Sequence, residues 1–126
     1  MLFSKPNDTT DGARAEALAA SYLSRHGLRI EARNFRVRGG EIDLVCRDGP
    51  TLVFVEVRQR RSLAQGGAAA SIVSAKQRRI VFAARHFLAR LASLPPCRFD
   101  AVLLQGRLDG PEPPAIEWLQ AAFDAG

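Results

Sequence analysis

The chain has 126 residues, of which 47% are hydrophobic, and its 18 Lys or Arg against 13 Asp or Glu give a net charge of +5. This length and composition predict a single domain over residues 1–126 with a buried core and no second domain. No apolar run reaches the roughly 18 residues of a membrane span, and residues 1–10 lack the apolar stretch of a signal peptide, so we expect a cytoplasmic protein without a membrane partner.

The first predicted element is a helix over about residues 11–25, in which Ala and Leu recur at helical spacing. Asp11 or Thr10 can cap this helix. A strand follows at about residues 28–37. Two turn signals, Gly39-Gly40 and Asp48-Gly49-Pro50-Thr51, then lead into two further strands. We therefore expect an antiparallel meander of three strands.

The second and third strands carry acidic side chains within otherwise apolar segments. If the turn between them is centred between Gly49 and Pro50, paired positions sum to 99, so that Asp43 faces Glu56 and Glu41 faces Arg58. Strand alternation then places these four side chains on one face. The same face also holds Val45 and Phe54, and the opposite face holds Ile42, Leu44, Val53, Val55 and Val57.

Two carboxylates placed opposite each other in a sheet require a counter-charge. At about 5 Å and an effective dielectric constant of about 20 they repel by roughly 3 kcal/mol, whereas a favourable cross-strand pair contributes about 0.2–1 kcal/mol. The counter-charge is either an arginine, with Arg38, Arg58 and Arg60 as candidates, or a divalent cation, since Mg²⁺ and Mn²⁺ prefer carboxylate oxygens. The first alternative gives a structural ion network and the second a metal site, and the pattern leaves both open.

After the third strand, Gln65-Gly66-Gly67 predicts a mobile loop. A second helix over about residues 74–92 begins with the capping box Ser74-Ala75-Lys76-Gln77. Residues 97–104 then form a strand parallel to the third one, because the helix provides a crossover connection. The core covers about residues 12–104. Residues 105–126 form an acidic, proline-containing extension that ends in a short element packed on the core.

The positive charge is concentrated in the body of the chain. Residues 1–99 hold 17 Lys or Arg against 8 acids, whereas residues 100–126 hold 1 against 5. Sixteen of the cations are arginines, which suit bidentate phosphate contacts but are equally typical of an arginine-rich coding bias. A basic flank on the second helix can follow a phosphate backbone or can be only a solvated face. The candidate nucleic-acid-binding residues are Arg36, Arg38, Arg60, Arg61, Lys76 and Arg79.

The order helix, three-stranded meander, helix and strand, with Asp on one strand and Glu-x-Arg on the next, resembles the restriction-endonuclease-like fold of the PD-(D/E)xK superfamily. Residues 12–104 also contain a succession of short motifs, namely Gly12-Ala13-Arg14-Ala15-Glu16, Arg33-Asn34-Phe35-Arg36, Gly40-Glu41-Ile42-Asp43-Leu44, Phe54-Val55-Glu56-Val57-Arg58, Gly66-Gly67-Ala68-Ala69 and Lys76. In this order the motifs make the segment more closely similar to the YraN-like family of small bacterial proteins, which is itself related to archaeal Holliday-junction resolvases. The resemblance implies an α/β fold in which helices flank a mixed central sheet, made of the antiparallel meander plus one parallel strand.

The resemblance implies a metal-dependent nuclease that hydrolyses phosphodiester bonds in DNA, either branched or single-stranded. Asp43 and Glu56 would bind Mg²⁺ or Mn²⁺, with the Val57 carbonyl as a third ligand. Glu16 would act on the metal directly or through water. Arg58 stands where the superfamily usually has Lys, and its guanidinium keeps the charge but cannot act as a general base. The predicted catalytic residues are Glu16, Asp43, Glu56, Arg58 and Lys76, whose helix could bring it to the site.

Two other functions stay open. A nucleic-acid-binding module that keeps the nuclease fold without catalysis is favoured by Arg58 in place of lysine. A protein-interaction subunit that uses the acidic tail has only the charge asymmetry in its support. Resolvase-like enzymes cut two strands as dimers, so the resemblance also raises a homodimer.

Overall fold

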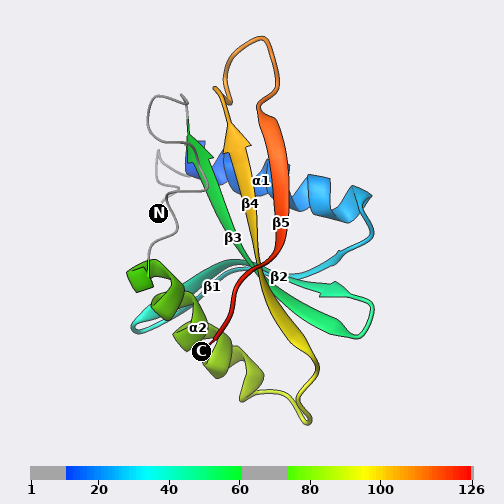
Figure 1. Ribbon diagram of the computed structural model, residues 1–126, viewed down its shortest axis with the longest axis vertical. Coiled ribbons are helices and arrows are strands. Elements are labelled where there is room, and N and C mark those ends of the chain that lie inside the picture. The colour runs from blue at the N-terminus through cyan, green and yellow to red at the C-terminus, as the bar shows by residue number, and fades with distance from the viewer. Residues whose placement is uncertain (1–10, 61–73, 126) are drawn as a thin grey trace, which may run out of the picture.

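The computed structural model describes residues 11–60 and 74–125, and within them it contains two helices and one five-stranded sheet (Figure 1). The neighbouring strands follow the chain order from β1 to β5, and every pair is antiparallel except the parallel pair of β3 with β4. The predicted mixed α/β fold is therefore confirmed. The elements are α1 (Asp11–Arg25), β1 (Arg29–Val37), β2 (Gly40–Asp48), β3 (Thr51–Arg60), α2 (Ser74–Leu88), β4 (Cys97–Gln105) and β5 (Ala115–Phe123).

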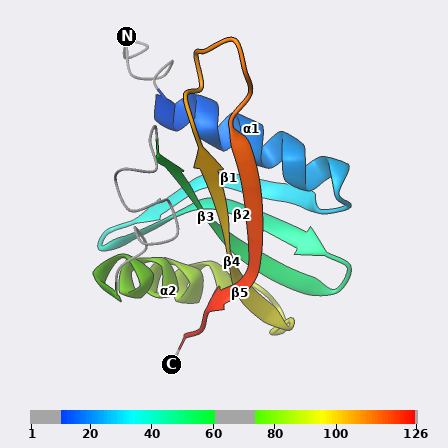
Figure 2. The same ribbon diagram turned by 45° about the horizontal axis from the view of Figure 1, so that its top comes forward.

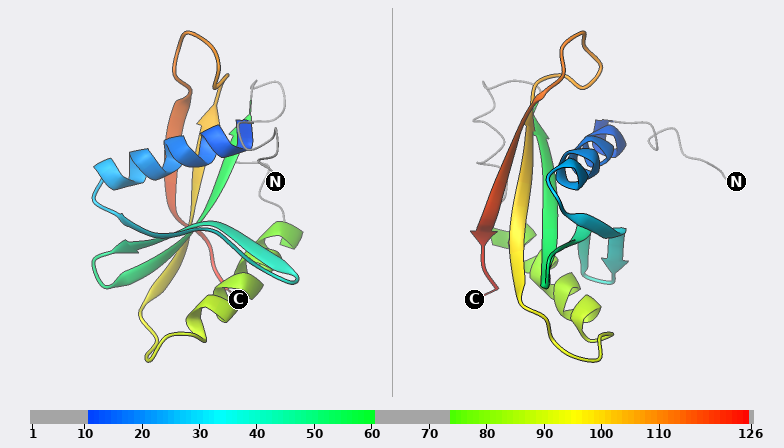
Figure 3. Two further views of the ribbon diagram at one scale, coloured as in Figure 1. Left: turned by 180° about the vertical axis from the view of Figure 1, so that it is seen from behind. Right: turned by 90° about the vertical axis from the view of Figure 1, so that its right-hand side faces the viewer.

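The two helices cover opposite faces of the sheet (Figure 2). Helix α1 packs Ala15, Ala19 and Leu23 against one face, which includes Val53 and Val55 of β3. Helix α2 packs on the other face with Leu52 and Phe54 of the same strand. Figure 3 shows α1 lying across the sheet. The alternation of β3 between its two faces thus agrees with the prediction.

The predicted register of the β2–β3 hairpin is correct near its turn and ends before the acidic residues. Paired positions sum to 99 from Asp48 and Thr51 as far as Leu44 and Val55, where the pairing stops. Beyond that point β2 stays paired with β1, while β3 continues beside β4. The predicted pairing of Glu41 with Arg58 is wrong, because β2 has left β3 and Glu41 is paired with Arg36 of β1 instead.

The side chains of β2 change faces at Asp43. Leu44 packs on the α1 side of the sheet, whereas Ile42, only two residues away, packs on the α2 side. The prediction that these two residues share a face is therefore wrong. On the neighbouring strand, Asn34 lies at the same level with a φ of 51°, in the left-handed region. The backbone of β1 thus departs from extended geometry at the level where the packing of β2 changes from one face to the other.

The C-terminal residues contribute more to the sheet than the sequence indicated. The predicted extension includes β5, which pairs antiparallel with β4 along Ala115–Phe123. Helix α2 ends at Leu88, earlier than predicted, and only single turn-type hydrogen bonds continue as far as Leu91. The predicted mobile loop, the motif at 66–69 and Arg61 lie outside the described residues. Over residues 11–60 and 74–125, no helix has the length and apolar character to cross a membrane.

Gly40 sets the close approach of β2 to α2. It is buried, and a Cβ atom at this position would collide with the carbonyl oxygen of Arg79 and lie 3.1 Å from the backbone nitrogen of Ala83. Both atoms belong to the backbone of α2, so they can move only if the helix moves. The absence of a side chain at Gly40 therefore fixes where α2 lies on the sheet.

We expect Gly40→Ala to lower the free energy of unfolding by about 1–3 kcal/mol, as overpacking of a tight site does. Denaturant unfolding followed by circular dichroism measures the change. Gly110→Ala is the matched control, because Gly110 has no positive φ and a Cβ there would lie 3.6 Å from its nearest neighbour. Equal stability of Gly40→Ala and wild type would contradict this account of the helix position.

Candidate functional site

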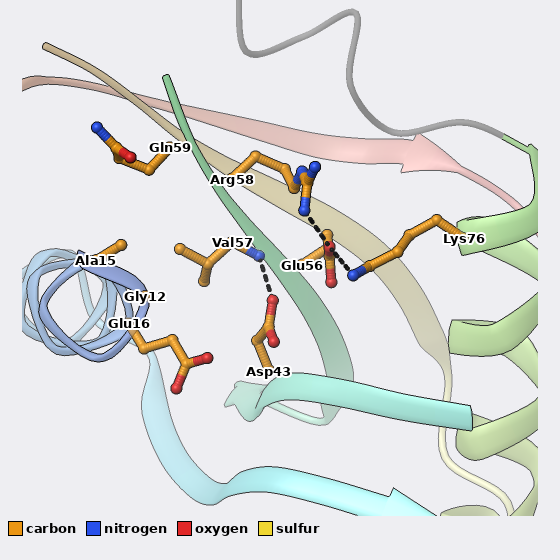
Figure 4. A pocket seen from close by; sticks show the side chains of 9 residues that line it. All are labelled: Gly12, Ala15, Glu16, Asp43, Glu56, Val57, Arg58, Gln59 and Lys76. Carbon is orange, nitrogen blue, oxygen red and sulfur yellow. Dashed lines mark hydrogen bonds and ion pairs between the residues drawn. The ribbon is translucent and has the colours of Figure 1, made fainter. Parts of the chain in front are cut away.

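A pocket of about 290 Å³ opens where β2 separates from β3 (Figure 4). Both helices contribute their first turns to it, and β2 and β3 form its floor. All five side chains that the sequence predicts as catalytic line this one pocket, together with Val57. The lining residues are Gly12, Ala15, Glu16, Asp43, Glu56, Val57, Arg58, Gln59 and Lys76.

Asp43 takes the place of a strand partner for β3. Its Oδ2 accepts a hydrogen bond of 2.8 Å from the backbone N–H of Val57, in the part of β3 that no longer pairs with β2. A buried backbone N–H requires an acceptor, and here a side-chain carboxylate supplies it. The contact holds the Asp43 carboxylate at the pocket next to Glu56.

Glu56 is buried without the hydrogen bonds that a buried carboxylate needs. Its residue is 1% exposed, and neither carboxylate oxygen has a hydrogen-bond partner among the described residues. Two cations approach Oε2 as ion pairs, with Lys76 Nζ at 3.2 Å and an Arg58 guanidinium nitrogen at 3.8 Å. The predicted counter-charge is therefore present at Glu56, and its nearest member is Lys76 rather than one of the arginines.

Burial and the neighbouring Asp43 charge raise the pKa of Glu56 to about 8, against the opposing effect of Lys76. Glu16 reaches towards the same carboxylates from α1 (Figure 4). Burial, followed by the charge of Asp43, raises the pKa of Glu16, while a hydrogen bond from Asn34 and the charge of Arg36 oppose the shift. The pKa values of both glutamates are therefore raised first by burial and then by the shared neighbour Asp43.

Asp100 provides an internal comparison that the sequence reasoning missed. It is 0% exposed, and it accepts hydrogen bonds from Ala121 N–H (2.9 Å), Trp118 Nε1 (2.9 Å) and Arg98 Nε (3.1 Å). Its signal in the sequence, an acid within an apolar strand, was the same as that of Asp43 and Glu56. Asp100 has the full set of partners of a structural carboxylate, whereas Glu56 does not.

The donors of the pocket fit a hard divalent cation better than zinc. Over residues 11–60 and 74–125, no group of three or more His, Cys, Asp or Glu side chains is arranged as a metal-ligand set. Mg²⁺ does not require one, because it is commonly bound by one or two carboxylates while water or substrate phosphate fills its other positions. Asp43 and Oε1 of Glu56, which has no hydrogen-bond partner in the described part of the chain, are oxygen donors of this kind.

The predicted nucleic-acid-binding arginines differ in their surroundings. Arg36 Nε and an Arg79 guanidinium nitrogen lie 3.5 and 3.6 Å from the Glu41 carboxylate, which offsets part of their charge. Arg38 is exposed after the end of β1. The side chain of Arg60, like Arg61, lies outside what the structure describes.

A model of the uncharacterised protein family UPF0102 matches residues 15–104. The chain belongs to this family. The match confirms the resemblance to the YraN-like family, and the matched segment contains Glu16, Asp43, Glu56, Arg58 and Lys76.

Curated relatives extend the similarity over nearly the whole chain. A UPF0102 protein of Cupriavidus taiwanensis is 58% identical over 96% of this chain and 88% of its own length. A UPF0102 protein of Polaromonas naphthalenivorans is 62% identical over 90% of this chain and 78% of its own length. One of Dechloromonas aromatica is 54% identical over 96% of both chains. The chain therefore corresponds to most of the length of these UPF0102 proteins.

The raised pKa of Glu56 predicts that stability decreases as the pH rises. Between its ordinary value near 4.5 and about 8, the folded protein keeps the proton that the unfolded chain has lost, so folding takes up a proton in this window. We expect the free energy of unfolding to decrease by up to about 1.4 kcal/mol per pH unit there. Urea unfolding at pH 5 and pH 8 measures the decrease.

Glu56→Gln removes the group with the larger shift, so this variant should show a smaller decrease of stability between pH 5 and pH 8 than wild type, while the raised pKa of Glu16 still contributes at the acid end of the window. Glu31→Gln is the control, because the pKa of Glu31 is lowered by Arg29 and Arg47 and its effect therefore lies at more acid pH. The same slope in Glu56→Gln and in wild type would contradict the assignment to Glu56.

Proposed function

We propose that the protein is a metal-dependent nuclease that hydrolyses phosphodiester bonds in DNA, and that UPF0102 is a branch of the PD-(D/E)xK superfamily. The observation that carries the proposal is Glu56, a buried carboxylate without hydrogen-bond partners among the described residues, beside Asp43 in an open pocket. The order of the elements and the Asp and Glu-x-Arg pattern support the superfamily. A cytoplasmic location, where DNA is accessible, and a homodimer belong to the same proposal.

Asp43 and Glu56 would hold Mg²⁺ or Mn²⁺, with the Val57 carbonyl as a further ligand. A divalent cation there would lower the pKa of the attacking water and offset charge on the phosphate oxygens. Glu16, on the opposite side of the pocket from Lys76, would orient a water molecule. The protein residues thus supply oxygen donors on the floor of the pocket and a third acid from α1.

The two cations at Glu56 would have different tasks. Arg58 keeps its charge at all working pH values, so it would bind a phosphate oxygen of the substrate. Lys76 can exchange a proton. It lies in the first turn of α2, with its Nζ 3.2 Å from Oε2 of Glu56. We assign to Lys76 the proton-transfer role that Arg58 cannot perform.

A second candidate is a nucleic-acid-binding module that keeps this fold without catalysis. The ion pair of Lys76 with Glu56 favours it, because a lysine already stands where a cation would approach that carboxylate. In this alternative, Asp43→Asn would leave DNA binding unchanged or strengthen it, since repulsion of phosphate decreases. The two candidates therefore differ in the effect of a divalent cation.

Addition of Mg²⁺ or Mn²⁺ should raise the melting temperature of wild type by several degrees. A ligand at a hundred times its Kd adds about 2.7 kcal/mol to the stability of the folded state. We expect no such rise in Asp43→Asn. Asp48→Asn is the control, because Asp48 lies on the same strand but pairs with Arg98 away from the pocket. A rise of equal size in Asp43→Asn would place the metal elsewhere.

Cleavage is tested on labelled single-stranded, duplex, flap and four-way-junction DNA with each metal. Cutting by wild type and not by Asp43→Asn is the expected result, and the substrate that is cut identifies the preferred DNA structure. Cutting by both would indicate a contaminant. Metal binding without cutting of any substrate would favour the non-catalytic module.

Lys76→Ala should slow cleavage by about 10²–10⁴-fold, the usual contribution of a proton-transfer group. Lys76→Arg keeps the charge beside Glu56 but cannot exchange a proton, so it should be nearly as slow. Arg25→Ala, which removes a cation from the last turn of α1 outside the pocket, is the control and should cut at close to the wild-type rate. A wild-type cleavage rate in Lys76→Arg would show that Lys76 acts only as an ion-pair partner of Glu56.

A further inference from the structure

The outward face of α2 carries an exposed aromatic ring. Phe82 is 42% exposed and, with Leu94, is one of two large hydrophobic residues that the described part of the chain leaves exposed. Its ring packs edge-to-face with His86 at 4.8 Å between centroids. Gly39, at the β1–β2 turn, lies so close that a Cβ atom there would be 3.3 Å from the ring. Phe82 is thus held in position although solvent reaches it.

Positive charge surrounds this ring. Helix α2 contains Lys76, Arg78, Arg79 and Arg85 and no acid within Ser74–Leu88. Lys76 and Arg79 are paired with Glu56 and Glu41. By contrast, no ion pair within the described residues involves Arg78 or Arg85, which lie four residues before and three residues after Phe82. These two charges therefore remain available to an anionic partner.

Two shallow hollows flank Phe82. One, of about 530 Å³, is lined by Arg78, Phe82 and Arg85 together with the first turn of α2 and with Asp124. The other, of about 310 Å³, is lined by Phe82, Arg85, His86 and Ala89. Phe82 and Arg85 line both hollows, so an aromatic ring and a guanidinium separate two recesses. Asp124 repels a phosphate in the larger hollow, whereas, among the described residues, no acid lines the smaller hollow, which also contains Arg85.

We propose that this face of α2 binds single-stranded nucleic acid, with an unpaired base stacked on Phe82 and the backbone phosphates on Arg78 and Arg85. Aromatic rings beside cations bind single strands because every base has a π-face, whereas in a duplex the bases are already stacked. Phe82 lies about 9 Å along the axis of α2 from Lys76, at 1.5 Å per residue. Phe82 also lies about 120° round the helix from Lys76, so a strand on this face would pass along α2 beside the side that carries Lys76.

The inference rests on the nucleic-acid partner of the proposed function and adds a preference for unpaired bases. It is tested by binding without catalysis. Fluorescence anisotropy of a labelled oligonucleotide in EDTA is compared for a single strand and a duplex of the same sequence. Both DNA and RNA strands are used, because the stacking chemistry is common to them.

Phe82→Ala should weaken single-strand binding about five- to hundred-fold and change duplex binding by less than about twofold. Phe82→Tyr, which keeps a ring, should bind single strands within about twofold of wild type. Leu94→Ala is the matched control, since Leu94 is 77% exposed but lies after α2, and it should bind as wild type does. Arg78→Ala and Arg85→Ala should each reduce the salt dependence of log K by about 0.7.

Unchanged single-strand binding by Phe82→Ala, or an equal loss for duplex and single strand, overturns the inference. Self-association of wild type that disappears in Phe82→Ala, measured by analytical ultracentrifugation, would assign the face to a second copy of the chain and also overturn it. Failure of the proposed catalysis has a different signature, because DNA would then remain uncut with every metal while the Phe82-dependent binding in EDTA persists.

Discussion

The separation of β2 from β3 is the constraint on which the pocket depends. Pairing stops after Leu44 and Val55, and the backbone N–H of Val57 would then lack an acceptor if Asp43 did not supply one. The carboxylate of Asp43 is therefore part of the hydrogen bonding of the sheet as well as part of the pocket. Because β2 turns away with β1, the space beside β3 is left to side chains from both helices rather than to another strand. An intact hairpin would have closed this space.

Glu16 and Lys76, the two charged side chains that the helices bring to the pocket, are positioned by different packing contacts. Helix α1 is fixed by its small residues Ala15 and Ala19 on one face of the sheet, and this places Glu16. Helix α2 is fixed on the other face by the contact of Gly40 with its backbone, and this places Lys76. Glu56 lies on β3 between them. The two helix N-termini thus meet at one pocket although they lie on opposite faces, and their partial positive charges favour anions there.

Sequence patterns predicted the helices, the meander and the parallel crossover, and the family resemblance indicated five of the side chains that line the pocket. They could not predict the geometry that brings this set together. The alternation rule applied to β2 assigns Ile42 and Leu44 to one face, whereas the structure packs Leu44 with α1 and Ile42 with α2, at the level where Asn34 of β1 has a positive φ. Asp100 carried the same signal as Glu56, and only the partners Trp118 and Ala121, far along the chain, show that it is a structural acid. The burial of each acid was predictable from the sequence, whereas the hydrogen-bond donors and cations that surround each carboxylate were not.

The difference between Asp100 and Glu56 also indicates why the fold keeps a buried carboxylate at position 56 that lowers its stability. A buried carboxylate without hydrogen bonds destabilises the folded state, since each missing partner leaves a desolvation cost of about 1–3 kcal/mol. Asp100 shows that this fold can provide three donors to a buried acid where the role is structural. At Glu56 the described residues provide two cations at 3.2 and 3.8 Å from Oε2 and no hydrogen-bond partner for Oε1, at an open pocket. A carboxylate in that condition gains most from a ligand that brings positive charge, and this is the physical reason to look for the function of the protein at Glu56.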